Sequence, residues 1–143
     1  MDMDRNTAFA VLLDIEKSEA FSNLALNRRI AENQPQNQAF VRELVYGVLK
    51  YKLLLDYQLD RLVKTGVRKL KKQDLTLLRM GMYQLIFMDR VPEYAAVSET
   101  VQMAKKYARG RESFINAVLR SFIRSGRKLQ LPDRAQDTVG YLS

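Results

Sequence analysis

The segment from Leu75 to Met88 most constrains the fold, because it carries apolar residues on nearly every side of a helical wheel. Arg79 is its one charged residue, and Asp74, just before it, is suited to cap the helix or to occupy its first turn. A helix that is apolar all round must be buried, so the rest of the chain has to enclose it. We expect the Arg79 guanidinium to need a carboxylate, and we predict an ion pair with Glu99 on the next helix.

The other segments repeat apolar residues at three- and four-residue steps, which is typical of amphipathic helices. They span residues 5–17, 22–33, 38–50 and 53–62, followed by 74–88 and by two more helices between residues 91 and 124. Ser22 is suited to cap the second of them. No stretch has the period of two that a half-buried strand requires. We therefore predict an all-α bundle of about six or seven helices, with residues 1–130 as one domain.

Gly47 lies inside the predicted helix 38–50. Glycine costs about 1 kcal/mol relative to alanine in a helix interior, so its presence there calls for a compensating contact. We expect another helix to cross closely at this position.

The positive charge is concentrated in two segments. The chain of 143 residues has a net charge of +8, while residues 50–72 alone carry +6 and residues 101–134 carry +7. This distribution favours a polyanionic partner such as RNA, DNA or an acidic membrane surface. The charge distribution alone is equally compatible with a solvated surface that binds no polyanion. The 50–72 segment in particular could be a solvated connector between helices.

Several classes of chemistry lack the residues that they need. The chain contains no cysteine and no histidine, which removes thiol nucleophiles, the usual zinc sites and the commonest general base. Its glycines form no phosphate-binding loop. The carboxylate pairs Asp14 with Glu16 and Asp56 with Asp60 are interpreted as solvated groups, and the helical tyrosines as packing residues more than stacking platforms. We expect this chain by itself to have no catalytic activity, no metal and no cofactor.

The sequence also argues against a membrane location. No apolar run approaches the roughly 20 residues of a membrane-spanning helix, and the amino-terminal MDMDRN has no apolar signal-peptide core. We expect a cytoplasmic protein without a membrane partner.

Three stretches resemble the NusB family. They are FVRELVYGVLKYKLLLD at residues 40–56, DLTLLRMGMYQLIFMDRVPEYAAVSETVQMAKKY at residues 74–107 and SFINAVLR at residues 113–120. Within that family the sequence of these stretches is most similar to the NusB-like domain at the amino terminus of RsmB-type (Sun/Fmu) ribosomal RNA cytosine-5 methyltransferases. The free antitermination factor looks more like INEAVELAK and FVNGVLD where this chain has VSETVQMAK and FINAVLR.

The resemblance implies a NusB-like helical bundle that binds or docks RNA for a 16S ribosomal RNA 5-methylcytosine methyltransferase. In such enzymes a linker leads from the NusB-like domain to a catalytic domain that holds S-adenosylmethionine and the cysteine nucleophiles. The resemblance implies that residues 131–143 are the first part of that linker. The implied partners are ribosomal RNA and that catalytic domain. Two alternatives stay open: a stand-alone antitermination factor that binds RNA with a small ribosomal protein, and a protein–protein module that packs on its own catalytic domain.

Candidate RNA-binding residues follow from the basic segments and the resemblance together. NusB proper has an arginine-rich amino-terminal segment, of which this chain retains one arginine. The basic corner between the last two helices supplies further cations, and the outer face of the last helix adds two. The candidates are Arg5, Arg28, Arg29, Lys105, Lys106, Arg109, Arg111, Arg120 and Arg124.

Overall fold

The computed structural model describes residues 2–18, 21–127 and 129, and these form seven α-helices and one short 3-10 helix. In chain order the elements are α1 (Met3–Ser18), α2 (Ser22–Asn33), α3 (Gln38–Lys50), α4 (Lys52–Leu62), η1 (Val67–Lys69), α5 (Lys72–Phe87), α6 (Glu93–Tyr107) and α7 (Glu112–Arg124). No strand occurs in this described part of the chain, and the prediction of an all-α bundle is confirmed.

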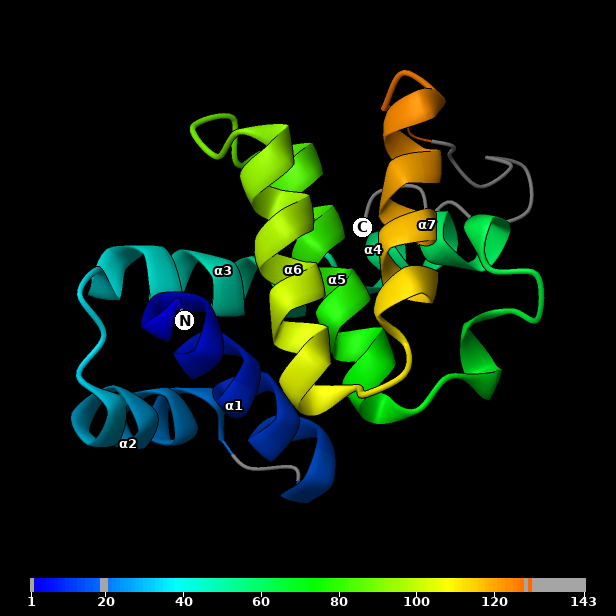
Figure 1. The fold of residues 1–143 in the computed structure, drawn as a ribbon. Helices are drawn as coiled ribbons and strands as arrows, with labels where there is room; N and C mark the ends of the chain where they lie inside the picture. Colours follow the sequence, from blue (N-terminus) through cyan, green and yellow to red (C-terminus); the bar gives the residue numbers. More distant parts are fainter. Residues whose placement is uncertain (1, 19–20, 128, 130–143) are drawn as a thin grey trace, which may run out of the picture.

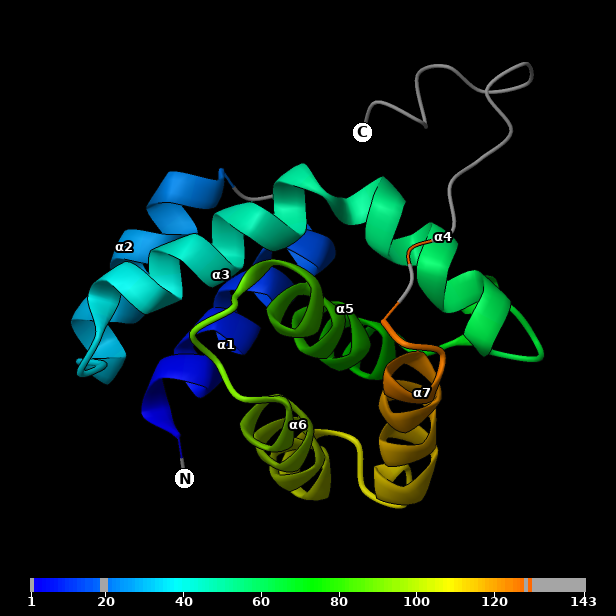
Figure 2. The ribbon, with the colours of Figure 1, turned by 90° about the horizontal axis from the view of Figure 1, so that it is seen from above.

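Helix α5 forms the centre of the bundle (Figure 1). It packs against α1, α3, α4, α6 and α7, which surround it when the molecule is viewed from above (Figure 2). Helix α2 lies on the outer side of the bundle and packs against α1. Every residue of α5 from Thr76 to Leu85 is buried, as its all-round apolar sequence predicts.

The crossing of α3 and α5 depends on Gly47. A Cβ atom added at this position would lie 2.1 Å from Cζ of Tyr83 on α5, far inside van der Waals contact. The Tyr83 ring fills the space that a side chain would need, and it packs beside Phe87 with the ring centroids 5.0 Å apart. The predicted close crossing is confirmed, and the ring contact compensates for the low helix propensity of glycine.

The one charge in the middle of α5 belongs to a network that we call the charged seam, formed by Arg79, Asp56, Glu16 and Lys52. The Arg79 guanidinium donates to both carboxylate oxygens of Asp56 at 2.7 and 2.8 Å, and to Glu16 at 3.1 Å. Lys52 donates to the same Glu16 oxygen at 2.8 Å. Burial by itself would lower the pKa of Arg79, but the bonds and charges of the two carboxylates outweigh it and raise that pKa.

The predicted pair of Arg79 with Glu99 is therefore wrong. Gly81, two residues along α5, lies against Thr100 of α6, since a Cβ there would be 3.3 Å from the Thr100 hydroxyl oxygen. Two helical residues correspond to a rotation of about 200°, so Arg79 points away from α6 and towards α1 and α4. The interpretation of Asp56 as merely solvated is also wrong, because both of its carboxylate oxygens accept hydrogen bonds from Arg79.

The remaining differences from the sequence predictions are local. Ser22 is the first residue of α2, and Phe21 occupies the cap position without a side-chain cap bond. By contrast, the prediction for Asp74 is confirmed, since it lies in the first turn of α5 while Lys71 holds the cap position. The predicted linker at residues 131–143 lies outside the described residues. Among those described, no helix has both the length and the apolar character of a membrane span.

Candidate functional site

The two cationic segments of the sequence meet where α6 turns into α7. Lys69 and Lys71 come from the connector before α5, and Arg109 and Arg111 come from the α6–α7 corner. All four line one hollow of about 510 Å³, which we call the corner hollow. The fold thus combines charges that lie about 40 residues apart in the sequence.

Local backbone structure explains this convergence. Helix α6 ends at Tyr107, and Gly110 turns the chain with a φ of 87°, a left-handed conformation that glycine adopts without a steric penalty. Helix α7 begins directly after this turn, and α5 begins directly after Lys71. Both helices therefore start near the corner hollow, and the partial positive charge at their amino-terminal ends adds to that of the side chains.

Most of the cations in the corner hollow have no acidic partner. Lys69, Lys71 and Arg109 are exposed and form no ion pair within the described part of the chain. Arg111 differs, because its Nε donates to the buried Asp74 at 3.0 Å and its guanidinium lies 4.1 Å from the centroid of the Phe114 ring. Three cations are thus available to an anion, while the fourth is held by the fold.

A second hollow lies on the other side of Tyr107, which lines both. This α1 hollow has a volume of about 390 Å³ and runs between α1, α2 and the end of α6, with Lys17, Arg29 and Lys106 among its lining residues. Arg29 is paired, since it donates twice to Asp14 at 2.7 and 2.8 Å. These bonds lower the pKa of Asp14, so its carboxylate stays charged.

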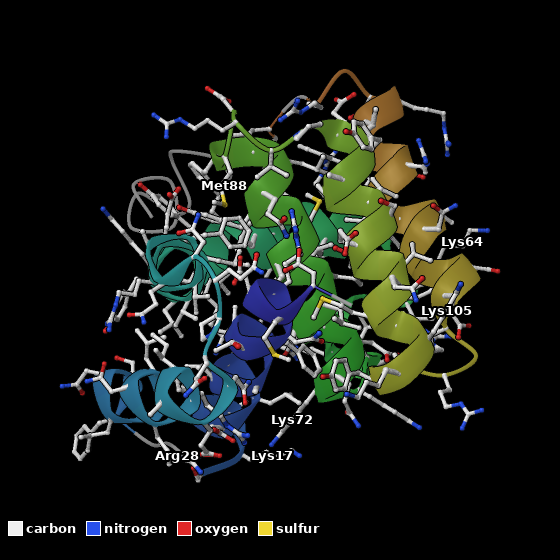
Figure 3. All side chains as sticks on the ribbon, turned by 60° about the vertical axis from the view of Figure 1, so that its left-hand side comes forward. Lys17, Arg28, Lys64, Lys72, Met88 and Lys105 are labelled. Atoms are coloured by element: carbon white, nitrogen blue, oxygen red, sulfur yellow. The ribbon has the colours of Figure 1, made fainter. Side chains whose placement is uncertain are left out.

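Lys72 connects the two regions at the surface. Its Nζ lies 3.5 Å from the main-chain oxygen of Glu16, so the start of α5 and the end of α1 are neighbours. Figure 3 shows Lys17, Lys72 and Arg28 at the same end of the molecule. We call the two hollows together with Lys72 the cationic end.

Arg5 does not belong to this surface, contrary to the prediction. Only 8% of it is exposed. Its Nε donates to Gln84 at 2.7 Å, it forms a salt bridge with Asp2, and its guanidinium lies over the Phe40 ring. A guanidinium held in this way stabilises the junction of α1, α3 and α5 and is not available to a ligand.

The other predicted residues fall into two groups. The cationic end contains Arg29, Lys106, Arg109 and Arg111. Outside the two hollows lie Arg28, bonded to Asp14 and Glu32, and the exposed Lys105, Arg120 and Arg124. The rise of an α-helix places Arg124 about 20 Å along α7 from the corner, so this arginine cannot share a compact site with Arg109.

Sequence reasoning missed Lys17, Lys69, Lys71 and Lys72 as site residues. The charge of +6 in residues 50–72 was the available signal for the last three. Nothing in the linear sequence indicates that the connector returns to the α6–α7 corner, because that contact depends on the packing of α5 against α6 and α7.

The fold and this surface define a class: a helical bundle built around one buried helix and charged positively at one end. The model of the NusB family matches residues 3–124, and the chain belongs to that family. A solved complex of the antitermination factors NusB and NusE with double-stranded RNA has a similar fold, with a TM-score of 0.78 and 21% identity over 87% of this chain and 96% of that one.

Curated relatives come from two groups of proteins. The probable ribosomal RNA small subunit methyltransferase B of Bacillus subtilis is 38% identical over 125 residues, covering 85% of this chain but only 28% of the relative. The transcription antitermination protein NusB of Levilactobacillus brevis is 33% identical over 122 residues, covering 80% of this chain and 86% of the relative. The chain thus spans less than a third of the methyltransferase's length and most of the antitermination protein's length.

Proposed function

We propose that this chain is the RNA-docking module of a small-subunit ribosomal RNA methyltransferase and that the cationic end contacts the RNA. The observation that carries the proposal is the corner hollow, where Lys69, Lys71 and Arg109 converge without an acidic partner in the described part of the chain. Unpaired cations around a hollow can neutralise successive phosphates and release their counterions. Such contacts give affinity and orientation and little information about base sequence.

The relatives support the same proposal. The identity to the Bacillus methyltransferase is higher than to the Levilactobacillus antitermination protein, and the match covers only a fraction of the methyltransferase. The methyl donor, for which we propose S-adenosylmethionine, and the catalytic residues would then belong to the part of the enzyme outside this chain. An enzyme that modifies ribosomal RNA would work in the cytoplasm.

Charge reversal tests the cationic end directly. The triple variant Lys69→Glu, Lys71→Glu and Arg109→Glu should bind single-stranded ribosomal RNA fragments about a hundredfold more weakly at low salt, and its affinity should depend less on salt. Fluorescence anisotropy over a salt series measures both quantities.

The matched control makes the same change of net charge elsewhere. Lys64, Arg120 and Arg124 are exposed and lie outside the two hollows, and their replacement by glutamate should lower affinity only a few-fold. Equal losses in the two triple variants would mean that the affinity depends on overall charge. Wild-type affinity that does not change with salt would refute phosphate docking altogether.

An antitermination factor is the second candidate, favoured by the relative that this chain nearly spans. The reading frame beyond Ser143 separates the two: a methyltransferase domain supports the first proposal, and a stop codon supports the second.

A protein–protein module is the third candidate, favoured by Leu53 and Tyr57, which are 63% and 37% exposed one turn apart on α4. That candidate predicts that the isolated chain has no measurable affinity for RNA.

A further inference from the structure

The α1 hollow has features that phosphate neutralisation does not explain. Its volume of about 390 Å³ lies within the ~300–1,000 Å³ that is usual for pockets that hold a small organic group. Two aromatic side chains, Phe9 and Tyr107, line it, whereas Tyr107 is the one aromatic residue that lines the corner hollow among the described residues. The rings of Phe9 on α1 and Tyr107 at the end of α6 stack with their centroids 4.4 Å apart.

A buried hydrogen-bond acceptor in this hollow lacks a partner. Asn6 lines the hollow and is only 5% exposed, and its Oδ1 accepts no hydrogen bond from the residues that the structure describes. The neighbouring polar side chains are satisfied, since Asn33 donates to the Thr7 hydroxyl at 3.1 Å and Arg29 is bonded to Asp14. An unpaired buried acceptor costs free energy, and a ligand that donates a hydrogen bond would recover it.

The edge of the hollow is cationic. Lys17 is exposed at the end of α1, and the Nζ of Lys106 lies 5.2 Å from the centroid of the Tyr107 ring. These features suit a ligand with three matching parts. A flat ring could lie against the aromatic side chains, a donor on its edge could reach the buried acceptor, and an attached anion could contact the two ammonium groups. A nucleotide combines these three properties.

We propose that the α1 hollow holds one unstacked base of a single RNA strand, with its exocyclic amino group donating to Oδ1 of Asn6. The terminal torsion of asparagine is soft, so a small rotation can turn Oδ1 towards the ligand. The ring lies against Tyr107, and Lys17 and Lys106 contact the flanking phosphates. This inference rests on the proposed RNA docking, and it gives the docked strand a path from the corner hollow past Tyr107.

The proposal predicts a preference among bases. The proposal assigns the contact with Asn6 to an exocyclic amino group, which adenine and cytosine carry. Uracil can donate only from its ring N3–H, which lies between two carbonyl groups whose oxygens would repel Oδ1 of Asn6. The chain should bind oligoadenylate and oligocytidylate about fivefold more tightly than oligouridylate of the same length. Replacing adenine by purine, which lacks the amino group, should remove that advantage without any change in the protein.

Asn6→Leu is the matching variant, because leucine has a similar size and no acceptor. It should bind all of these oligonucleotides with the weaker affinity of oligouridylate, with an unchanged salt dependence. Its thermal stability should equal or exceed that of the wild type, since an unpaired buried polar group has been removed. If Asn6 had only a structural role, the substitution would not raise thermal stability and remove the base preference at the same time.

Thr76→Val is the control. Thr76 on α5 is 2% exposed, its hydroxyl oxygen is the other buried side-chain atom without a partner in the described residues, and it does not line the hollow. This variant should keep the base preference. A wild type that binds all bases equally, or prefers uridylate, overturns the base pocket and leaves RNA docking intact. Absence of binding to any oligonucleotide instead overturns the proposed function.

Discussion

The charged seam and the cationic end use the same residue types for opposite purposes. In the charged seam, Arg79 is 7% exposed and donates to the carboxylates of Asp56 and Glu16, and Lys52 donates to Glu16 as well. In the corner hollow, three exposed cations have no acidic partner among residues 2–18, 21–127 and 129, although Asp74 lines the same hollow. The seam joins α1, α4 and α5, whereas the cationic end leaves its charge unsatisfied at the surface.

The difference shows how burial decides what an arginine or lysine does. A buried guanidinium must have its charge and its donors satisfied, so its loss affects folding. An exposed ammonium group is hydrated by water, so its loss has little effect on folding and a large effect on a polyanionic partner. Stability and RNA affinity should therefore separate cleanly between the two regions.

Removal of the seam arginine should have the largest effect. Arg79→Leu leaves the partly buried carboxylates of Asp56 and Glu16 without this guanidinium, and we expect a loss of about 3 kcal/mol in the free energy of unfolding. Urea unfolding followed by circular dichroism measures this loss. RNA affinity, measured under conditions where the variant is folded, should stay within twofold of the wild type.

Lys71→Leu is the matched change at the cationic end. It removes one exposed cation and should alter the free energy of unfolding by less than about 0.5 kcal/mol. A comparable destabilisation by both leucine variants would contradict the separation of folding and binding charges.

The fold could be predicted from sequence because its main determinant is local. The apolar residues around Arg79 require a central helix, and the spacing of apolar residues elsewhere defines the helices that cover it. Gly47 even indicated a close crossing, because its low helix propensity needs a compensating contact. The partner of Arg79 could not be predicted, since Glu16, Asp56 and Glu99 all lie on other helices and only their packing selects among them.

The candidate site was predicted in part for the same reason. Arg109 and Arg111 sit in one short turn, so their proximity is a property of the sequence. Lys69 and Lys71 join them only because α5 positions its own start beside the end of α6. Asn6 carried no sequence signal, because an unsatisfied acceptor is defined by what surrounds it.

Acid should weaken the charged seam. The hydrogen bond from Lys52 and the charge of Arg79 hold the pKa of Glu16 below its ordinary value of 4.5, despite the opposing effect of burial. A carboxyl whose pKa is lower in the folded state stabilises the protein above its unfolded pKa, and this contribution is lost as the pH falls through the folded value. We expect stability to fall on the order of 1 kcal/mol below pH of about 4, as chemical unfolding at several pH values will measure.

Glu16→Gln should flatten that dependence, because the amide does not titrate. Glu32→Gln is the control, since Glu32 is exposed and forms only a 3.4 Å pair with Arg28. An unchanged pH profile in Glu16→Gln would argue against a contribution of the seam to acid sensitivity.

A smaller effect is expected at the buried carboxylate of the corner hollow. Asp74 is 3% exposed and is the one carboxylate that lines the corner hollow among the described residues, and it accepts a hydrogen bond from Arg111. Asp74→Asn removes the negative charge but keeps a hydrogen-bond acceptor, so Arg111 becomes available to phosphate. RNA affinity should rise about threefold, while the loss of an acid from the first turn of α5 lowers stability by about 0.5 kcal/mol.

Asp89→Asn provides the matching change of net charge away from the hollow, because the exposed Asp89 follows the far end of α5, about 20 Å from the start of that helix. Because exposed charges beyond about 10 Å are screened at moderate salt, this variant should leave RNA affinity nearly unchanged. Equal affinity gains in the two variants would mean that Asp74 acts only through total charge. A gain confined to Asp74→Asn would locate the phosphate contact at Arg111, because that arginine is the group that the substitution releases.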